Sequence, residues 1–211
     1  MKVGILGSGV VAQTLAAGFV KHSHSVMLGT RSPAKLADWA AQNKAQVGSF
    51  ADTAAFGELV VLAVKGSVAE QVAKSAGAGL KGKVVMDTTN PIADKPPTNG
   101  VLSFFTTLEG SLLERLQAAR ADVRFVKAFN SVGNARMVNP VFKDGRPTMF
   151  ICGNDETARN DVAKICNQFG WDVQDLGKAE AARAIEPLCI LWCIPGFLRN
   201  EWTHAYSVLH T

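Results

Sequence analysis

The chain has 211 residues, which is enough for one large or two small domains with a real hydrophobic core. Apolar residues make up 47% of it and charged residues 19%, proportions typical of a soluble globular protein. The net charge of +4 is mild, and no basic run is interleaved with aromatic residues, so we expect no nucleic-acid partner.

Cysteine usage and the absence of targeting signals indicate an ordinary cytoplasmic protein. The cysteines form no C-x-x-C pair and have no histidine partner at ligand spacing, so we expect buried thiols and no metal site. The first predicted strand begins almost at the N-terminus, which leaves no room for a signal peptide. No apolar run approaches the roughly 20 residues that span a bilayer, so we expect no membrane partner.

The first predicted elements are a strand over residues 2–6, a glycine turn, a helix over residues 10–20 and a strand over residues 25–28. This order is that of a dinucleotide-binding unit. Gly7 permits the tight turn, and Gly9, which has no side chain, lets a pyrophosphate approach the N–H groups at the start of the helix. The alternative is a tight turn that binds no ligand. The expected phosphate-binding residues are Gly7, Ser8, Gly9, Val10 and Val11.

The end of the second strand indicates which dinucleotide binds. An NAD site usually has a carboxylate about 20 residues after the glycines, to bond the ribose 2′-hydroxyl. This chain instead has Thr30, Arg31 and Ser32 there, with Lys35 shortly after. A guanidinium fork, hydroxyls and an ammonium suit a phosphate, so the sequence favours NADP(H). Ordinary solvated surface charges are the alternative.

Strands and helices alternate along the rest of the chain. Helices are expected at residues 34–43, 51–56, 68–76 and 108–119, with another, capped by Asp155, running to residue 169. Strands are expected at residues 46–50, 58–64, 83–89, 122–126, 148–153 and 171–177. The alternation predicts an α/β protein whose residues 1–177 form a Rossmann-type, doubly wound, mostly parallel sheet.

Residues 178–211 are expected to form a short helical C-terminal segment, interrupted at Pro187 and Pro195. Residues 188–194 are nearly all apolar. A segment this small cannot bury its own apolar face, so we expect it to pack over the mouth of the site or against a second subunit.

In a doubly wound sheet, ligands bind beyond the carboxyl ends of the strands. Lys65 could therefore meet a phosphate, and Thr89 or Asn90 the nicotinamide ribose. The Asn130 amide suits the nicotinamide carboxamide or a substrate carbonyl. Helix capping and turn formation are the alternatives for these positions. The cofactor-facing loop residues are Ala63, Val64, Lys65, Thr89, Asn90, Pro91 and Asn130.

The loop over residues 91–107 is long for a compact domain, and such loops are usually functional or disordered. Its second half, residues 101–105, is too apolar for a solvated linker. We expect it either to plug into the core or to form a lid over a flat ring beside the nicotinamide.

Four stretches of the sequence together resemble a known family. They are Gly7-Ser8-Gly9-Val10-Val11-Ala12, Gly29-Thr30-Arg31-Ser32-Pro33, Val126-Lys127-Ala128-Phe129-Asn130-Ser131-Val132 and Cys152-Gly153-Asn154-Asp155. With these stretches the chain resembles the coenzyme F-420-dependent NADP reductase family over essentially its whole length. It is also similar to the cytosolic oxidoreductase domain of the six-transmembrane metalloreductases.

The resemblance implies a homodimer in which Thr30 and Arg31 meet the 2′-phosphate and the nicotinamide lies near the loops after Val64, Asn90 and Asn130. It also implies direct hydride transfer between NADPH and a flavin or deazaflavin, with no obligatory side-chain acid. The archaeal deazaflavin enzymes tend to have a histidine where this chain has Asn130. The asparagine is closer to the metalloreductase domain, which reduces a flavin.

We therefore expect an NADPH-dependent oxidoreductase with a small-molecule redox acceptor, either a flavin or a deazaflavin such as coenzyme F-420. One alternative is an NADP-dependent reductase of a small imine or hydroxy acid, with Lys127 as candidate acid or base. Such enzymes usually add a long all-helical domain, and only about 35 residues follow Leu176. The other alternative is a non-enzymatic NADP-binding redox sensor, whose partner surface would be the apolar tail around Trp192 and Phe197.

Overall fold

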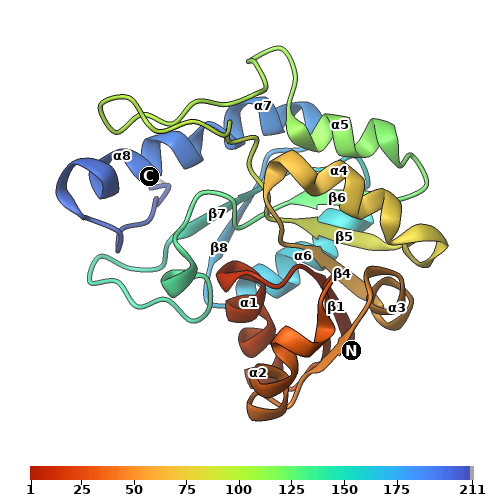
Figure 1. Cartoon of the computed structure of the whole chain (residues 1–211). Coiled ribbons are helices and arrows are strands. Elements are labelled where there is room, and N and C mark those ends of the chain that lie inside the picture. The colour runs from red at the N-terminus through yellow and green to blue at the C-terminus, as the bar shows by residue number, and fades with distance from the viewer. Residues whose placement is uncertain (210–211) are drawn as a thin grey trace.

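The computed structural model describes residues 1–209, which form a parallel sheet with helices on both faces (Figure 1). Its strands lie in the order β3-β2-β1-β4-β5-β6, and all neighbours are parallel. The predicted Rossmann-type, doubly wound α/β fold is confirmed. The strands are β1 (Lys2–Leu6), β2 (Ser25–Gly29), β3 (Gln46–Gly48), β4 (Leu59–Leu62), β5 (Val84–Asp87) and β6 (Arg124–Lys127).

A second, smaller sheet lies beside β6. It consists of the parallel strands β7 (Thr148–Ile151) and β8 (Asp172–Asp175). An antiparallel bridge between Lys127 and Cys152 joins it to the main sheet, with Lys127 N donating to Cys152 O over 2.9 Å. The loop that follows β6 is therefore held between the two sheets.

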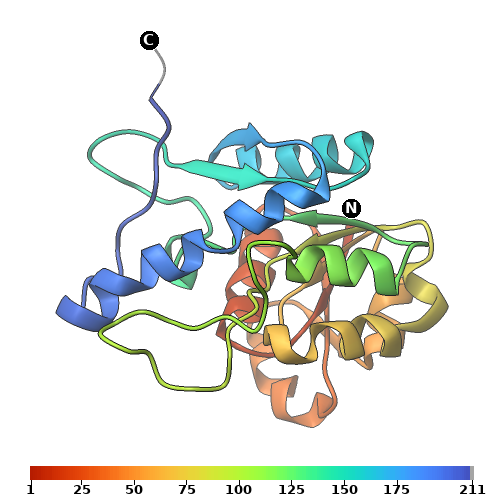
Figure 2. The same cartoon turned by 90° about the horizontal axis from the view of Figure 1, so that it is seen from above.

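The helices form two layers. Side chains of a strand alternate between faces, so the main sheet feeds a core on each side. Figure 2 shows α6 on one side of the sheet and α4 and α5 on the other. The helices are α1 (Val10–Lys21), α2 (Ala37–Gln42), α3 (Phe50–Phe56), α4 (Gly66–Ser75), α5 (Leu112–Ala119), α6 (Glu156–Gln168), α7 (Ala182–Ile185) and α8 (Leu188–Arg199).

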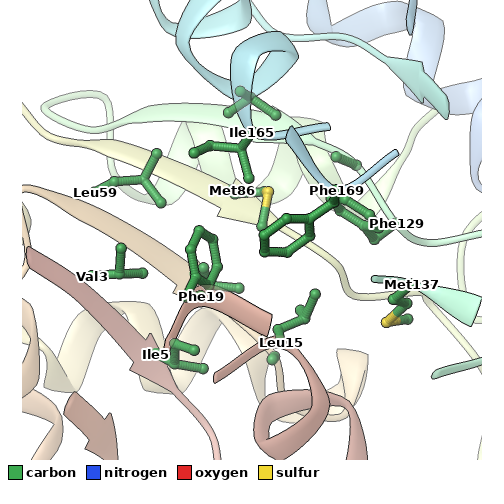
Figure 3. Close-up of a cluster of buried hydrophobic side chains, with 14 of the residues drawn as sticks. Val3, Ile5, Leu15, Phe19, Leu59, Met86, Phe129, Met137, Ile165 and Phe169 are labelled. Carbon is green, nitrogen blue, oxygen red and sulfur yellow. The ribbon is translucent and has the colours of Figure 1, made fainter. Parts of the chain in front are cut away.

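The first core lies under α1 and α6. Figure 3 shows Phe19 of α1 surrounded by strand residues and by Phe169, whose ring centroid lies 4.9 Å from that of Phe19. The second core combines residues of the main sheet with residues of α4, α5 and α7, including Leu116 and Ile185. Because α7 contributes to a core under the sheet, the C-terminal segment is fixed directly to the nucleotide-binding fold.

The predicted helix bounds are shifted by a few residues in several places, and two helices differ in a way that has a clear physical cause. The helix expected from residue 108 begins at Leu112, because Ser111 is its N-cap and forms a capping box with Glu114. The helix after Pro187 continues through Pro195 and ends at Arg199, and its C-cap Asn200 has a left-handed φ of 58°. Residues 201–209 are not helical, and Thr148 N of β7 donates to Tyr206 O. The last residues of the predicted C-terminal segment, 210 and 211, lie outside the described residues.

One helical stretch contradicts the expectation about apolar runs. Ala179–Arg199 spans 21 residues and is long and apolar enough to cross a membrane by length and composition alone. Helices that pack into the core of a globular protein pass the same criterion, and 33% of its most apolar window is buried. Within this stretch Glu186 is buried in an ion pair with Lys127, so part of the stretch belongs to the folded domain.

Candidate functional site

A cavity of about 1060 Å³ opens beyond the carboxyl ends of β1, β2 and β4. Its position is the one predicted for a ligand of a doubly wound sheet. Every predicted cofactor residue as far as Lys65 lines it: Gly7, Ser8, Gly9, Val10, Val11, Thr30, Arg31, Ser32, Lys35, Ala63, Val64 and Lys65. The sequence signals were glycine, hydroxyl and basic residues directly after strands, so local reasoning was enough to predict that these residues lie together.

The two glycines of the first turn serve different purposes. Gly7 has a φ of 146°, and a Cβ added there would lie 2.1 Å from Ala63 O, so only glycine fits the fold. A Cβ on Gly9 would have no neighbour within 4 Å. Gly9 is also the N-cap of α1, so the N-cap position has no side chain to cap that helix, and the first turn has no acidic residue. Open space before uncapped N–H groups is what a pyrophosphate needs.

Replacing Gly9 with alanine is expected to separate binding from folding. Alanine readily adopts the backbone φ of −76° and ψ of 179°, so the free energy of unfolding should change by less than about 0.5 kcal/mol. The added methyl group would occupy the approach to the α1 N–H groups, so NADPH affinity should fall at least tenfold, measured by calorimetric titration. Gly7→Ala should instead lower the free energy of unfolding, because only glycine fits the fold at this position. Unchanged NADPH affinity in Gly9→Ala would contradict the phosphate site.

The far end of the cavity is basic. Arg31 and Lys35 are exposed in its wall, and no aspartate or glutamate lines it among residues 1–209. Thr30 is largely buried, and its hydroxyl accepts from Ser32 N over 3.2 Å, which shapes the turn that carries Arg31. This end of the cavity therefore fits the 2′-phosphate of NADP(H) and lacks the carboxylate that would bond an NAD ribose.

The later predicted residues, Thr89, Asn90, Pro91 and Asn130, do not line this cavity, although their neighbour Thr88 does. The Thr89 hydroxyl donates to Asp87 Oδ1 over 2.7 Å, so it is committed to the protein. Asn90 and Asn130 bond each other: Asn90 Nδ2 donates to Asn130 O over 2.7 Å, and Asn130 Nδ2 donates to Asn90 Oδ1 over 3.1 Å. Cofactor contact by these residues stays a prediction.

Lys127, the candidate acid or base, is fully buried in an ionic cluster. Its ammonium lies 2.6 Å from Asp87 Oδ2 and 2.9 Å from Glu186 Oε1, and donates to Thr89 O over 2.8 Å. All three of its donors are therefore used. Burial alone would lower the pKa of Lys127, but the two carboxylates outweigh it and raise that pKa. A charged, enclosed and fully bonded ammonium cannot exchange protons with a substrate.

Sequence reasoning did not predict that Asp87 and Glu186 pair with Lys127. Asp87 and Lys127 pair directly across β5 and β6, so two opposite charges at the ends of adjacent apolar strands were a usable signal. Glu186 gave no such signal, because it lies in the C-terminal segment, far along the chain from both Asp87 and Lys127.

The cysteines are mostly buried as predicted, and burial raises the pKa of Cys152 to about 12, which makes it unreactive.

The loop over residues 91–107 lies beside α8 (Figure 2). Phe105 packs against the second core, with the Arg115 guanidinium over its ring. Phe104 instead lines a smaller cavity of about 190 Å³ with Pro187 and Ile190. The two neighbouring phenylalanines therefore differ in their surroundings. Phe105 packs on the core, as expected for a core plug, and Phe104 faces a space against the C-terminal helices.

Comparison with known proteins places the chain in a family. Residues 2–91 match the sequence model described as NADP oxidoreductase, coenzyme F420-dependent. The chain is 30% identical to the F420-dependent NADP reductase of Methanocaldococcus jannaschii over 208 residues, covering 89% of each protein. It superposes with a TM-score of 0.92, at 30% identity and full coverage of both chains, on a crystal structure from Arthrobacter sp. FB24 provisionally assigned as an F420-dependent NADP reductase.

Other relatives are more distant or longer. Metalloreductase STEAP3 of Rattus norvegicus is 29% identical over 212 residues, which cover 93% of this chain and 39% of that protein. A Streptomyces aurantiacus imine reductase shares the fold, with a TM-score of 0.69 at 16% identity. The fold and the basic cavity define an NADP-binding oxidoreductase of Rossmann type. The chain belongs to the coenzyme F420-dependent NADP oxidoreductase family.

Proposed function

We propose that the protein transfers hydride between NADP(H) and a flavin or deazaflavin ring. The observation that carries the proposal is a basic cavity at the carboxyl ends of the strands, beside the glycine turn, which no aspartate, glutamate or histidine lines among residues 1–209. When bound, NADPH supplies a hydride, two electrons and one proton, to the acceptor ring and leaves as NADP⁺. This reaction needs the two rings held in contact and little proton transfer from side chains.

The residues of the cavity divide the work of holding the cofactor. The N–H groups after Gly9 would bind the pyrophosphate, and Arg31 with Lys35 the 2′-phosphate. Val10 is 62% exposed at the start of α1, and Val68 of α4 is 39% exposed across the same cavity. Apolar side chains left open in a cavity wall are suited to cover the flat faces of a bound ligand and to exclude water.

Redox chemistry on a small imine or hydroxy acid is less well supported. Such a reaction needs a proton donor beside the substrate. The candidate named for it, Lys127, has no exposed surface and no free hydrogen. Initial rates of NADPH oxidation with FMN, FAD, coenzyme F420 and 1-pyrroline test the choice. Turnover of the imine alone would contradict the proposal, and turnover of none of them would favour a redox sensor.

A homodimer built on α8 is also proposed. Leu191, Phe197 and Leu198 of this helix are 55%, 45% and 55% exposed. Apolar side chains grouped on one helix support an interface between subunits. Sedimentation velocity measures the assembly directly, and a monomer at micromolar concentration would contradict this part of the proposal.

The lid prediction can be tested at the two phenylalanines. Phe104→Ser should slow hydride transfer while leaving NADPH affinity and stability unchanged, if that ring faces the acceptor. Phe105→Ser should lower the free energy of unfolding by roughly 2 kcal/mol, because its ring packs on the second core. Stopped-flow kinetics and urea unfolding of both variants provide the measurements. Unfolding of Phe104→Ser would assign that ring to the core.

A further inference from the structure

Glu186 lies where the C-terminal helices meet the rest of the fold. It occupies the short joint between α7 and α8 and is 1% exposed. Besides its ion pair with Lys127, its carboxylate accepts from the first-turn N–H groups of α5, Leu112 N and Leu113 N, each over 3.0 Å. Helix N-termini favour such a negative charge. One side chain therefore fixes the α7–α8 joint to both β6 and α5.

The residue next to Glu186 sets the orientation of Asn130. Asn130 Nδ2 donates to Ile185 O over 3.0 Å as well as to Asn90 Oδ1. A backbone carbonyl can only accept, so the Asn130 atom that faces it must be the nitrogen. Asn130 Oδ1 is buried and has no partner among the described residues. The amide is thus held by the C-terminal joint, with its oxygen left for another donor.

The backbone before Asn130 is held from the opposite side. Phe129 has a φ of 58°, a left-handed conformation that is unusual for a bulky residue. Its N–H donates to Met149 Sδ of β7 over 3.0 Å, and its ring packs against Phe169 and Trp171 in the first core. Strained backbone of this kind persists where the surroundings enforce it, often at functional sites.

We propose that Glu186 is a positioning residue for the nicotinamide end of the site: it locks the joint whose Ile185 carbonyl orients Asn130. The proposal rests on the proposed function, because it takes the Asn90–Asn130 pair as the nicotinamide end. The same ammonium that Glu186 pairs with also holds Thr89 O, in the loop that carries Asn90. Loss of the Glu186 charge should loosen both amides together, without touching the phosphate end.

A matched control variant is available in the same helices. Arg183 of α7 pairs with Glu114 of α5 over 2.6 Å, so it also joins the C-terminal segment to α5. Among residues 1–209 the Arg183 side chain has Glu114 as its one hydrogen-bonded partner and bonds neither Lys127 nor Asn130. A purely structural role for the α5 junction would give Glu186→Gln and Arg183→Gln similar effects.

The first experiment measures binding and needs no turnover. NADP⁺ and 2′-phospho-ADP-ribose, in which a hydroxyl replaces the nicotinamide, are titrated calorimetrically into the parent protein and both variants. Glu186→Gln should lose at least fivefold in its preference for NADP⁺ and keep its affinity for 2′-phospho-ADP-ribose within twofold. Arg183→Gln should keep both. Failure of the parent to bind either nucleotide would instead refute the proposed function.

The second experiment follows which face of the nicotinamide reacts. NADPH deuterated on one or the other face of C4 is oxidised with FMN in single-turnover experiments. The parent should transfer hydride from one face, and Glu186→Gln should transfer from both, at least tenfold more slowly. Identical behaviour of Glu186→Gln and Arg183→Gln in both experiments would overturn the positioning role. If Glu186→Gln does not fold, Glu186→Asp replaces it, because aspartate keeps the charge but has a shorter side chain. Glu186→Asp should also lose the preference for NADP⁺. An unchanged preference would overturn the positioning role.

Discussion

Replacing Lys127 with methionine is expected to lower the free energy of unfolding by about 3–5 kcal/mol. The substitution leaves Asp87 and Glu186 buried and close together with no cation between them. The two carboxylates raise the pKa of Lys127 above its ordinary 10.5 despite its burial. The contribution of the Lys127 charge to the free energy of unfolding is therefore fully present at neutral pH. It is lost only as the pH rises through the raised pKa of Lys127. Urea unfolding at pH 7 measures the change.

Lys164 provides the control for this prediction. It also pairs with an aspartate, Asp161 at 2.8 Å, but its side chain is 76% exposed. Exposed pairs contribute little, so Lys164→Met should change stability by less than about 1 kcal/mol. Equal losses in the two variants would show that the buried cluster contributes no more than a surface ion pair.

Replacing Arg31 with alanine is expected to weaken NADPH binding by roughly 2 kcal/mol, or about 30-fold, and to spare NADH. The guanidinium lies in the wall of the cavity end that has no carboxylate, where the 2′-phosphate is expected. Because the contact is exposed, the difference should shrink as salt is added. Calorimetric titration with both nucleotides measures it.

Arg115 is the matched arginine for that experiment. It is exposed, lies outside the cavity and covers Phe105. Arg115→Ala should therefore leave both affinities unchanged. Equal loss of NADPH and NADH affinity in Arg31→Ala would refute recognition of the 2′-phosphate.

The parts of the protein that could be predicted from sequence are those encoded locally. The turn at Gly7 and Gly9 directly follows β1, and the basic residues directly follow β2. Both strands can be predicted from their own apolar residues. Backbone sterics and charge at such places depend little on the rest of the chain. Both the fold and the basic end of the cavity could be predicted from these local patterns.

The parts that could not be predicted depend on contacts between distant segments. From sequence alone Lys127 is a candidate acid or base. In the structure Asp87 of a neighbouring strand and Glu186 of the C-terminal helices pair with it, so it is not available for that role. A proline usually ends a helix, yet α8 continues through Pro195. Contacts of α8 with the rest of the chain support it, and Trp192 Nε1 donates to His204 O over 2.8 Å. Tertiary contacts decided both cases.

The central claim is tested most directly by anaerobic stopped-flow mixing of the NADPH-loaded protein with FMN, FAD or coenzyme F420. We predict that at least one of these rings is reduced in a single turnover, with one NADPH oxidised per ring, and that NADH at the same concentration reduces it at least tenfold more slowly. Reduction of none of the three rings, or equal rates with NADH and NADPH, would contradict the account.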